Sequence, residues 1–295
     1  MDSSCGFSHY NYVLSQVKQR MMARIGPMTS LYSGVVSPEY FQSGKMLRTR
    51  MVARLAECID DTAMLENLIT ACAATELLHS ATLCHDDIID KAVVRRNLPT
   101  TWVAATPSAA VLTGDLLLCE SIDLLQNMCD GRYVAHFIGK VREVCLAEIE
   151  QELISRGSNI DENACIRLAR GKTGPLFAFL GIVFGGTSSA LSSALEESGY
   201  LIGTAYQLAD DLLDIVGQET HAGKTLGSDA KREKYTYAFY NHGDRERIYD
   251  TVAALCSEAL NNLNPWPKTR ACLEHYFEKE LQPVFSLIDA DMIIG

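Results

Sequence analysis

The stretch LLHSATLCHDDIIDKAVVRRNLPTTW, residues 77–102, places three aspartates and a pair of arginines directly after an apolar run. The run reads as a buried helix, and Asp86 and Asp90, four residues apart, lie on one face of such a helix. Carboxylates carried into an apolar environment would take up protons unless a cation compensates them. The stretch therefore predicts a helix end with a strongly positive ligand beside its aspartates and a strongly negative one opposite Arg95 and Arg96.

The same DDxxD pattern recurs at Asp210, Asp211 and Asp214, within the apolar segment YQLADDLLDIV. A single DDxxD cluster is more often a solvated helix end than a functional site. Two clusters that each interrupt an apolar helix favour carboxylates that face an internal cavity. Ligation by carboxylates alone, without His or Cys, suits magnesium shared with phosphate better than zinc or calcium.

Basic residues recur beside Gly and Thr along the chain. Besides Arg95 and Arg96, they are Lys45 and Arg48 in SGKMLRT, Lys172 in GKTGP, Lys224 in GKTLGSD and Lys234 in REKYT. In a chain that is acidic as a whole, this pattern indicates ligands for phosphate groups. For each residue taken alone, surface ion pairing is the alternative.

The composition excludes several classes of protein. The 295 residues carry a formal net charge of -11, so we expect no binding to nucleic acid. The ten cysteines form no CxxC pair and fall mostly in apolar runs, which predicts reduced core residues of a cytoplasmic protein. The N-terminus lacks a signal-peptide profile, and the longest apolar run, at 176–184, is too short to span a bilayer. We therefore expect a soluble protein with no transmembrane segment.

Apolar residues three and four positions apart predict helices along most of the chain, and no run alternates like a half-buried strand. The clearest helical patterns cover 10–25, 64–83, 133–154, 162–184, 194–216 and 247–263. Asn159 and Asp161 are suitable caps for the helix that follows them. The sequence predicts one all-α domain over residues 1–295, a bundle of about ten helices.

The motifs taken together resemble one family over nearly the full length. In family order they are GKMLR, LLHSATLCHDDIID, RRNLPTTW, VLTGDLLL, GKTGPLF, YQLADDLLD, GKTLGSD and EKYT. The chain resembles the trans-isoprenyl diphosphate synthases, which are head-to-tail prenyltransferases. The resemblance implies the isoprenoid synthase fold, with a central apolar cavity, and condensation of isopentenyl diphosphate with an allylic diphosphate. It also implies about three magnesium ions per active site and a homodimer, with a heteromer as the alternative.

The resemblance also implies a role for each matching residue. Metal ligands would be Asp86, Asp87, Asp90, Asp210, Asp211 and Asp214. Direct ligands of the allylic diphosphate would be Arg95, Lys172, Lys224 and Lys234. Ligands of isopentenyl diphosphate would be Lys45, Arg48, His79 and Arg96. Thr173 and Gln207 would place oxygens near the developing allylic cation. The catalytic set would comprise Asp86, Asp87, Asp90, Asp210, Lys172, Lys224, Thr173 and Gln207. His85, next to Asp86, is interpreted as supporting that aspartate or as structural.

Five positions depart from the family pattern. Ser43, Met46 and Thr49 replace Gly, Arg and Pro of the usual GGKRLRP run, Asn97 stands where Gly is common after the arginine pair, and Glu233 stands where Gly often precedes the lysine. None of these changes removes a predicted metal ligand. Together they leave open weak activity or dependence on a partner subunit.

Residues on the N-terminal side of Asp86 bear on product length. In the family a bulky aromatic four or five residues before this aspartate stops elongation, and here those positions are Thr82 and Ala81, with Leu77 one turn deeper. We expect the opposite wall to come from VLTGDLLLCES, residues 111–121, and from 176–184. With one helical turn for each isoprene unit, the hypothesis is an all-trans product of roughly five or more units. Ordinary core packing of Ala81 is the alternative.

Three other functions stay open. A geranylgeranyl or farnesyl diphosphate synthase would use the same site with a shorter product. A class I terpene cyclase would release hydrocarbons from an allylic diphosphate alone, although the second DDxxD favours elongation. A non-catalytic partner subunit usually lacks aspartates of one cluster, and this chain keeps all six.

Overall fold

The computed structural model describes residues 9–31, 39–42, 44–126, 128, 131–155, 160–216 and 236–285. Its elements, in chain order, are α1 (His9–Leu31), α2 (Glu39–Gln42), α3 (Leu47–Leu55), the 3₁₀ turn η1 (Ala56–Cys58), α4 (Thr62–Ile89), β1 (Val94–Arg95), β2 (Leu98–Pro99), α5 (Thr101–Ala104), α6 (Pro107–Gln126), α7 (Arg132–Ile149), the π turn η2 (Glu150–Ser155), α8 (Glu162–Gly185), α9 (Ser189–Val216), α12 (Tyr237–Tyr240), α13 (Arg245–Asn261), α14 (Pro267–Tyr276) and the π turn η3 (Phe277–Leu281).

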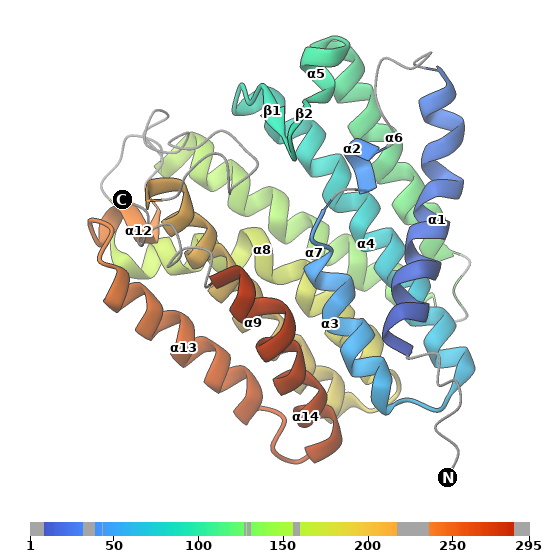
Figure 1. Cartoon of the computed structure of the whole chain (residues 1–295), viewed down its shortest axis with the longest axis vertical. Helices are drawn as coiled ribbons and strands as arrows, with labels where there is room; N and C mark the ends of the chain where they lie inside the picture. The colour runs from blue at the N-terminus through green and yellow to red at the C-terminus, as the bar shows by residue number, and fades with distance from the viewer. Residues whose placement is uncertain are drawn as a thin grey trace.

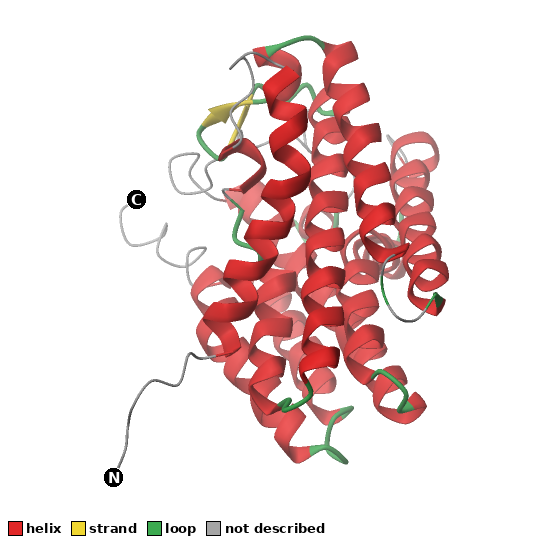
Figure 2. Ribbon diagram, turned by 90° about the vertical axis from the view of Figure 1, so that its right-hand side faces the viewer, coloured by secondary structure: helices red, strands yellow, loops and turns green. Residues whose placement is uncertain are grey.

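The long helices run alongside one another as a bundle (Figures 1 and 2). In the described part, the only strands are β1 and β2, which pair antiparallel over two residues each at one end of the bundle. The prediction of an all-α fold is confirmed. The sequence pattern did not indicate the strand pair, because two residues are too few to show alternation.

Helix α4 lies at the centre, with α1, α3, α6 and α8 packed around it. Asp61 caps its N-terminus, because the carboxylate accepts hydrogen bonds from the backbone N–H groups of Ala63 and Met64. Its apolar residues face almost all directions, as expected for a helix enclosed by others. The central position brings the aspartates at its C-terminal end, Asp86 and Asp90, to the interior of the bundle.

Helices α8 and α9 pack closely against each other, and glycines set their separation. A Cβ added at Gly203 would lie 2.5 Å from the Cα of Gly174, and one at Gly199 would lie 2.6 Å from the backbone of Ala178. Asp161 caps α8 by accepting from the N–H of Ala164, which confirms one predicted cap. Asn159, the other predicted cap, lies outside the described residues.

The prediction that most cysteines belong to the core was wrong for the described ones. Cys72, Cys84 and Cys165 are buried, but Cys58, Cys256 and Cys272 are half-buried, and Cys119 and Cys145 are exposed. Cys145 lies on α7 among the residues that line the cavity described below, and the length of an apolar run does not tell which face of a helix is covered. Among the described helices, none is long and apolar enough to cross a membrane.

Candidate active site

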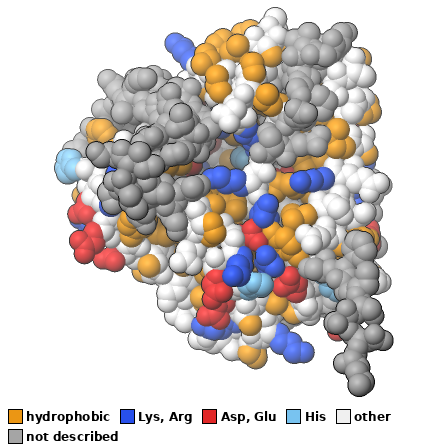
Figure 3. Space-filling model, in the orientation of Figure 1, with side chains coloured by type: hydrophobic (Ala, Val, Ile, Leu, Met, Phe, Trp, Pro, Cys, Tyr) orange, Lys and Arg blue, Asp and Glu red, His pale blue; other side chains and the backbone are white. Residues whose placement is uncertain are grey.

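A cavity of about 1250 Å³ lies among α4, α7, α8 and α9. Residues of the segments 44–48, which leads into α3, and 91–97, which contains β1, contribute to its wall. Lys and Arg side chains gather in the middle of the face drawn in Figure 3. One region of the wall carries aspartates, another carries cations, and apolar side chains such as Leu176 and Phe177 lie between α4 and α8. The cavity thus combines strong charge with an apolar interior.

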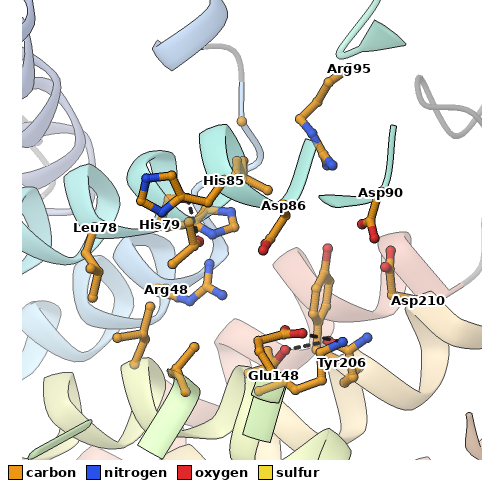
Figure 4. A pocket seen from close by; sticks show the side chains of 18 of the residues that line it. Arg48, Leu78, His79, His85, Asp86, Asp90, Arg95, Glu148, Tyr206 and Asp210 are labelled. Carbon is orange, nitrogen blue, oxygen red and sulfur yellow. Dashed lines mark hydrogen bonds and ion pairs between the residues drawn. The ribbon is translucent and has the colours of Figure 1, made fainter. Parts of the chain in front are cut away.

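Four of the predicted aspartates line this cavity from two helices. Asp86 and Asp90 come from the end of α4, and Asp210 and Asp214 come from α9. In Figure 4 the carboxylates of Asp90 and Asp210 point toward one another across the cavity. The two DDxxD segments, far apart in the sequence, therefore form facing walls of one site.

The second aspartate of each cluster has a different environment. Asp87 is 1% exposed, and its carboxylate accepts hydrogen bonds from Tyr40 and, at 2.7 Å, from the Arg95 guanidinium. Asp211 is buried and accepts from the Gln207 side-chain amide at 2.8 Å. Neither lines the cavity. The structure places both where they fix the position of a neighbouring predicted site residue.

The donor chemistry of the cavity fits magnesium. Within the described ranges, no three His, Cys, Asp or Glu side chains lie close enough to form a preassembled cation site. Magnesium commonly binds through one or two carboxylates together with substrate phosphates and waters. Carboxylates on facing walls, such as Asp86, Asp90 and Asp210, suit an ion that arrives with a phosphorylated substrate.

The cations of the cavity wall come from α3, which precedes α4 in the chain, and from the segment that follows α4. Arg48, in α3, lies over the Phe177 ring at 5.3 Å, and its buried Nε has no hydrogen-bond partner among the described residues. His79 lies beside it on α4, and burial together with the charges of Arg48, Arg96 and Arg95 lowers the pKa of the imidazole well below its ordinary value. The imidazole is therefore neutral at pH 7 and able to donate one hydrogen bond.

Arg96 reaches the cavity from an unusual backbone conformation. Its φ is +55° and that of Asn97 is +61°, a region that Asn tolerates better than most residues other than Gly. The Arg96 guanidinium donates to the Tyr40 carbonyl at 3.1 Å, and a Cβ on Gly44 would lie 2.6 Å from it. The Asn in place of the family Gly thus keeps the turn that presents Arg96. The replacement at Met46 also has a positive φ, of +50°, at the start of α3.

Lys172, Thr173 and Gln207 meet between α7, α8 and α9. The Lys172 ammonium donates to Gln151 at 2.6 Å and lies 3.3 Å from the Glu148 carboxylate. Gln151 belongs to the π turn η2, a type of distortion that is frequent at functional sites. The Thr173 hydroxyl donates to the Gln207 amide oxygen at 2.5 Å. All three predicted residues line the cavity.

Sequence reasoning missed a carboxylate in the cationic wall. Glu76 lines the cavity, is 5% exposed and accepts a hydrogen bond from the Thr49 hydroxyl at 2.7 Å. Its charge acts on Arg48 and Arg96, opposing the effect of burial on the pKa of each guanidinium. The only sequence signal was a single acidic residue in the apolar run ACAATELLHS. Thr49, which replaces the family Pro, supplies a hydroxyl that Pro lacks.

His85 packs against α6 at the edge of the cavity. Its Nε2 lies 3.2 Å from the Val111 carbonyl oxygen and 3.4 Å from the Asp115 carboxylate. A Cβ on Gly114 would lie 2.3 Å from this ring nitrogen. The glycine of the VLTGDLLL motif thus provides the space into which His85 fits.

The positions predicted to control product length are not all in the cavity wall. Thr82 lines the cavity, but Ala81 and Leu77 are packed in the core, and the wall one turn deeper is Leu78. No residue of the expected opposite wall 111–121, which belongs to α6, lines the cavity. The other expected segment, 176–184, does contribute, through Leu176 and Phe177 of α8. Among the described residues, Val141 and Val144 of α7 line the cavity as well.

Lys45 and Arg95 line the cavity together with the residues above. Lys224 and Lys234, and the departures at Ser43 and Glu233, lie outside the described residues.

Comparison with known proteins shows the family of the chain. Residues 33–253 match the family described as polyprenyl synthetase. The chain belongs to this polyprenyl synthetase family. The recognition made from the motifs is therefore confirmed.

Curated relatives of this polyprenyl synthetase family member include two geranylgeranyl diphosphate synthases. The protein of Methanosarcina mazei is 31% identical over 206 residues, which are 67% of this chain and 63% of that protein. The protein of Mycobacterium tuberculosis is 32% identical over 202 residues, which are 66% of this chain and 57% of that protein. Heptaprenyl diphosphate synthase component 2 of Bacillus subtilis is 35% identical over 52% of this chain and 45% of that protein. The matches thus span less than two thirds of these relatives.

Solved structures share the fold over nearly the whole chain. A geranyltransferase from Helicobacter pylori, complexed with magnesium and isoprenyl diphosphate, superposes with a TM-score of 0.74 at 19% identity and covers 95% of this chain and 99% of its own. A polyprenyl synthase from Caulobacter crescentus, complexed with calcium and isoprenyl diphosphate, gives 0.65 at 21% identity, with 93% and 97% covered. At these identities the likeness establishes the fold.

Proposed function

We propose that the chain is a magnesium-dependent trans-prenyltransferase that condenses isopentenyl diphosphate with an allylic diphosphate to give a longer all-trans isoprenyl diphosphate. The observation that carries this proposal is the arrangement of one cavity. Asp86 and Asp90 face Asp210 and Asp214 across it, and the cations Arg48 and Arg96 line the same cavity. Relatives named geranylgeranyl and farnesyl diphosphate synthase support it.

Two diphosphates would occupy different parts of the wall. Arg48, Arg96 and the neutral imidazole of His79 would bind isopentenyl diphosphate, since they lie together and Arg48 has a donor group to offer. Arg95 and Lys172 would bind the allylic diphosphate near the aspartates. Fixing both substrates in one cavity would supply the orientation that bond formation requires.

The aspartates would hold magnesium on the allylic diphosphate, and the bound metal would stabilise the charge that grows on this leaving group. Thr173 and Gln207, hydrogen-bonded to each other, would keep oxygens close to the developing cation. Apolar residues such as Leu176 and Phe177 would exclude water from it.

For the product, we propose an all-trans chain of roughly five or more isoprene units, with one helical turn for each unit. The residues that line the cavity from α4 between Glu76 and Asp86 are Leu78, His79, Thr82, Leu83 and His85, with no Phe, Tyr or Trp among them. A farnesyl or geranylgeranyl product remains the alternative, because Phe177 lines the cavity from α8.

For the assembly, we propose a homodimer through α6 and α7. These helices expose large apolar side chains, among them Leu112 at 67% and Leu146 at 53%. An apolar surface of this kind marks protein–protein contacts. Relatives named component 2 of a heptaprenyl diphosphate synthase make a heteromer the alternative. Light scattering of the purified chain distinguishes a dimer from a monomer that awaits another subunit.

The decisive experiment incubates the purified chain with magnesium, isopentenyl diphosphate and, separately, dimethylallyl, geranyl, farnesyl and geranylgeranyl diphosphate. Chromatography of the dephosphorylated products should show longer prenyl alcohols that disappear with a chelator and return with added magnesium. Hydrocarbons formed from an allylic diphosphate alone would instead indicate a cyclase. A folded protein that forms no product with any primer would contradict the proposal for the isolated chain.

A further inference from the structure

Helix α2, only four residues long, brings one tyrosine into contact with the supports of two adjacent arginines. Tyr40 and Phe41 of this helix are 3% and 2% exposed, and their rings pack edge to face with centroids 5.1 Å apart. The Tyr40 hydroxyl donates to the Asp87 carboxylate, near the end of α4. Tyr40 does not line the cavity. It therefore acts on a bound substrate only through its neighbours.

The hydroxyl of Tyr40 reaches Arg95 through Asp87. It donates to Oδ2 of this carboxylate, while Nε and one terminal nitrogen of Arg95 each lie 2.7 Å from Oδ1. Asp87 is 1% exposed, so water has almost no access to either oxygen. Arg95 lines the cavity and points toward Asp86 and Asp90 in Figure 4. The hydroxyl thus fixes the carboxylate that directs Arg95 to the region of these aspartates.

The backbone of the same tyrosine holds Arg96. The Arg96 guanidinium donates to the Tyr40 carbonyl oxygen at 3.1 Å and also lines the cavity. A Cβ added at Gly44 would lie 2.6 Å from the other terminal nitrogen of this guanidinium. Arg96 therefore has little room to move toward Gly44. Its position depends on the peptide of Tyr40 and not on the tyrosine side chain.

Other groups hold the backbone that carries the two arginines. The Thr100 hydroxyl and the Trp102 indole N–H both donate to the Ala92 carbonyl oxygen at 2.8 Å. The Thr100 N–H donates to the Val93 carbonyl oxygen at 3.1 Å. The contacts that start from Tyr40 therefore orient the guanidinium groups and are not needed to shape the chain beneath them.

We propose that Tyr40 is a positioning residue shared by the two diphosphate subsites. Its hydroxyl orients Arg95, through Asp87, toward the allylic diphosphate, and its carbonyl oxygen orients Arg96 toward isopentenyl diphosphate. A guanidinium that is held in advance loses less conformational freedom when it binds an anion. The inference rests on the proposed function, because that function assigns the two arginines to different substrates.

The two contacts can be separated by substitution, since only one of them involves the side chain. Tyr40→Phe removes the hydroxyl and keeps the ring and the carbonyl oxygen. It should weaken binding of an allylic diphosphate by about three- to tenfold, the range for one lost hydrogen bond, and change the affinity for isopentenyl diphosphate by less than about twofold. Gly44→Ala should do the reverse, because the added methyl group displaces Arg96 and leaves Arg95 in place.

Isothermal titration calorimetry of the full chain with magnesium measures both affinities. Farnesyl thiodiphosphate, an allylic analogue that reacts slowly, is titrated first, and isopentenyl diphosphate is then titrated into protein saturated with the analogue. The KM values for the two substrates in steady-state kinetics should show the same division between the variants.

Tyr237→Phe is the matched control. Tyr237 is 2% exposed, and its hydroxyl also donates to a carboxylate, that of Glu162, at 3.0 Å, but it does not line the cavity. This variant should lower the melting temperature about as much as Tyr40→Phe, because each loses one buried hydrogen bond. It should change neither affinity, which separates a positioning role from a purely structural one.

The assignment is overturned if folded Tyr40→Phe binds the allylic analogue as tightly as the wild type, or weakens both ligands equally. Equal weakening of both ligands by Gly44→Ala also overturns it. In these cases the wild type still forms product and the proposed function stands. Wild-type protein that binds neither diphosphate would overturn the proposed function together with the role of Tyr40. Circular dichroism of each variant establishes that folded proteins are compared.

Discussion

At the scale of single residues, Asp86 and Asp87 of the first DDxxD have different environments and different expected roles. Asp86 lines the cavity, whereas Asp87 is buried against Arg95 and Tyr40. Asp86→Asn should therefore lower kcat by about 10²-fold or more, by analogy with loss of one group that stabilises the transition state. It should cost less stability than the loss of Asp87, because the buried Asp87–Arg95 ion pair stays intact.

Asp87→Asn should instead destabilise the protein by about 3 kcal/mol, because it leaves the Arg95 guanidinium without its buried counter-charge. Steady-state kinetics and urea denaturation of both variants separate the two effects. A loss of activity in Asp87→Asn with unchanged stability would show that Asp87 acts in the cavity after all.

A second pair of neighbours tests the control of product length. Thr82 lines the cavity, while Ala81 is 2% exposed in the core. Thr82→Phe should shorten the main product, because the ring extends into the path of the growing chain. The sequence predicts the same result for Ala81→Phe, but the structure indicates core overpacking there, which costs about 1–3 kcal/mol. Product chromatography together with thermal melting decides which position limits the chain, and unchanged products from Thr82→Phe would remove it from that wall.

At the scale of helices, the separation of α8 and α9 decides whether the site forms. Gly203 contacts the backbone of α8 at Gly174, next to Thr173, and Gln207 follows one turn later on α9. Gly203→Ala should push the helices apart and lower the free energy of unfolding by about 1–3 kcal/mol. It should also break the Thr173–Gln207 hydrogen bond. We therefore expect a drop in kcat larger than the loss of folded protein accounts for.

Gly139→Ala is the matched control, because a Cβ there has no atom within 4 Å. It lies within α7 and should stabilise the protein by about 0.5–1 kcal/mol, since Ala is the better helix former. Calorimetry and steady-state kinetics on both variants measure the changes in stability and in kcat. Equal behaviour of the two alanines would mean that α9 accommodates the extra methyl group without moving.

Helical periodicity accounts for what the sequence could predict about these elements. The pattern predicted α4, α7, α8 and α9, and it gave the face of each helix that carries Asp86 or Asp210. The pattern could not predict which side chains form hydrogen bonds with one another. A bond between Thr49 and Glu76, or between Tyr40 and Asp87, depends on how separate elements pack. Such contacts require the three-dimensional arrangement.

At the scale of the whole molecule, a single carboxylate connects the two ends of the described chain. Glu280, in η3, accepts hydrogen bonds from Tyr10 of α1 and from Arg50 and Arg54 of α3, at 2.7, 2.7 and 2.9 Å. Arg50 also donates to the carbonyl oxygen of Lys45 at 2.8 Å. The network therefore extends from the C-terminal end of the described bundle to a segment of the cavity wall.

This connection should make stability depend on pH. Burial opposes the charge of Glu280, but the hydrogen bonds from Tyr10, Arg54 and Arg50 together lower the pKa of its carboxyl group. A group with a lowered folded-state pKa contributes its stability above the unfolded value, near 4.3, and loses it as pH falls through the folded value. Glu280→Gln should therefore cost about 2 kcal/mol at pH 7 and progressively less below about pH 4.

Urea denaturation of wild type and variant at pH 7, 5 and 3 measures this difference. Glu66→Gln serves as the control, because Glu66 pairs with Arg20 on the surface with its side chain 52% exposed, where an ion pair contributes about 0.5 kcal/mol or less. The difference in unfolding free energy between wild type and Glu280→Gln could instead stay constant from pH 7 to pH 3. That result would mean that packing of the Glu280 side chain, and not its charge, holds the two ends of the bundle together.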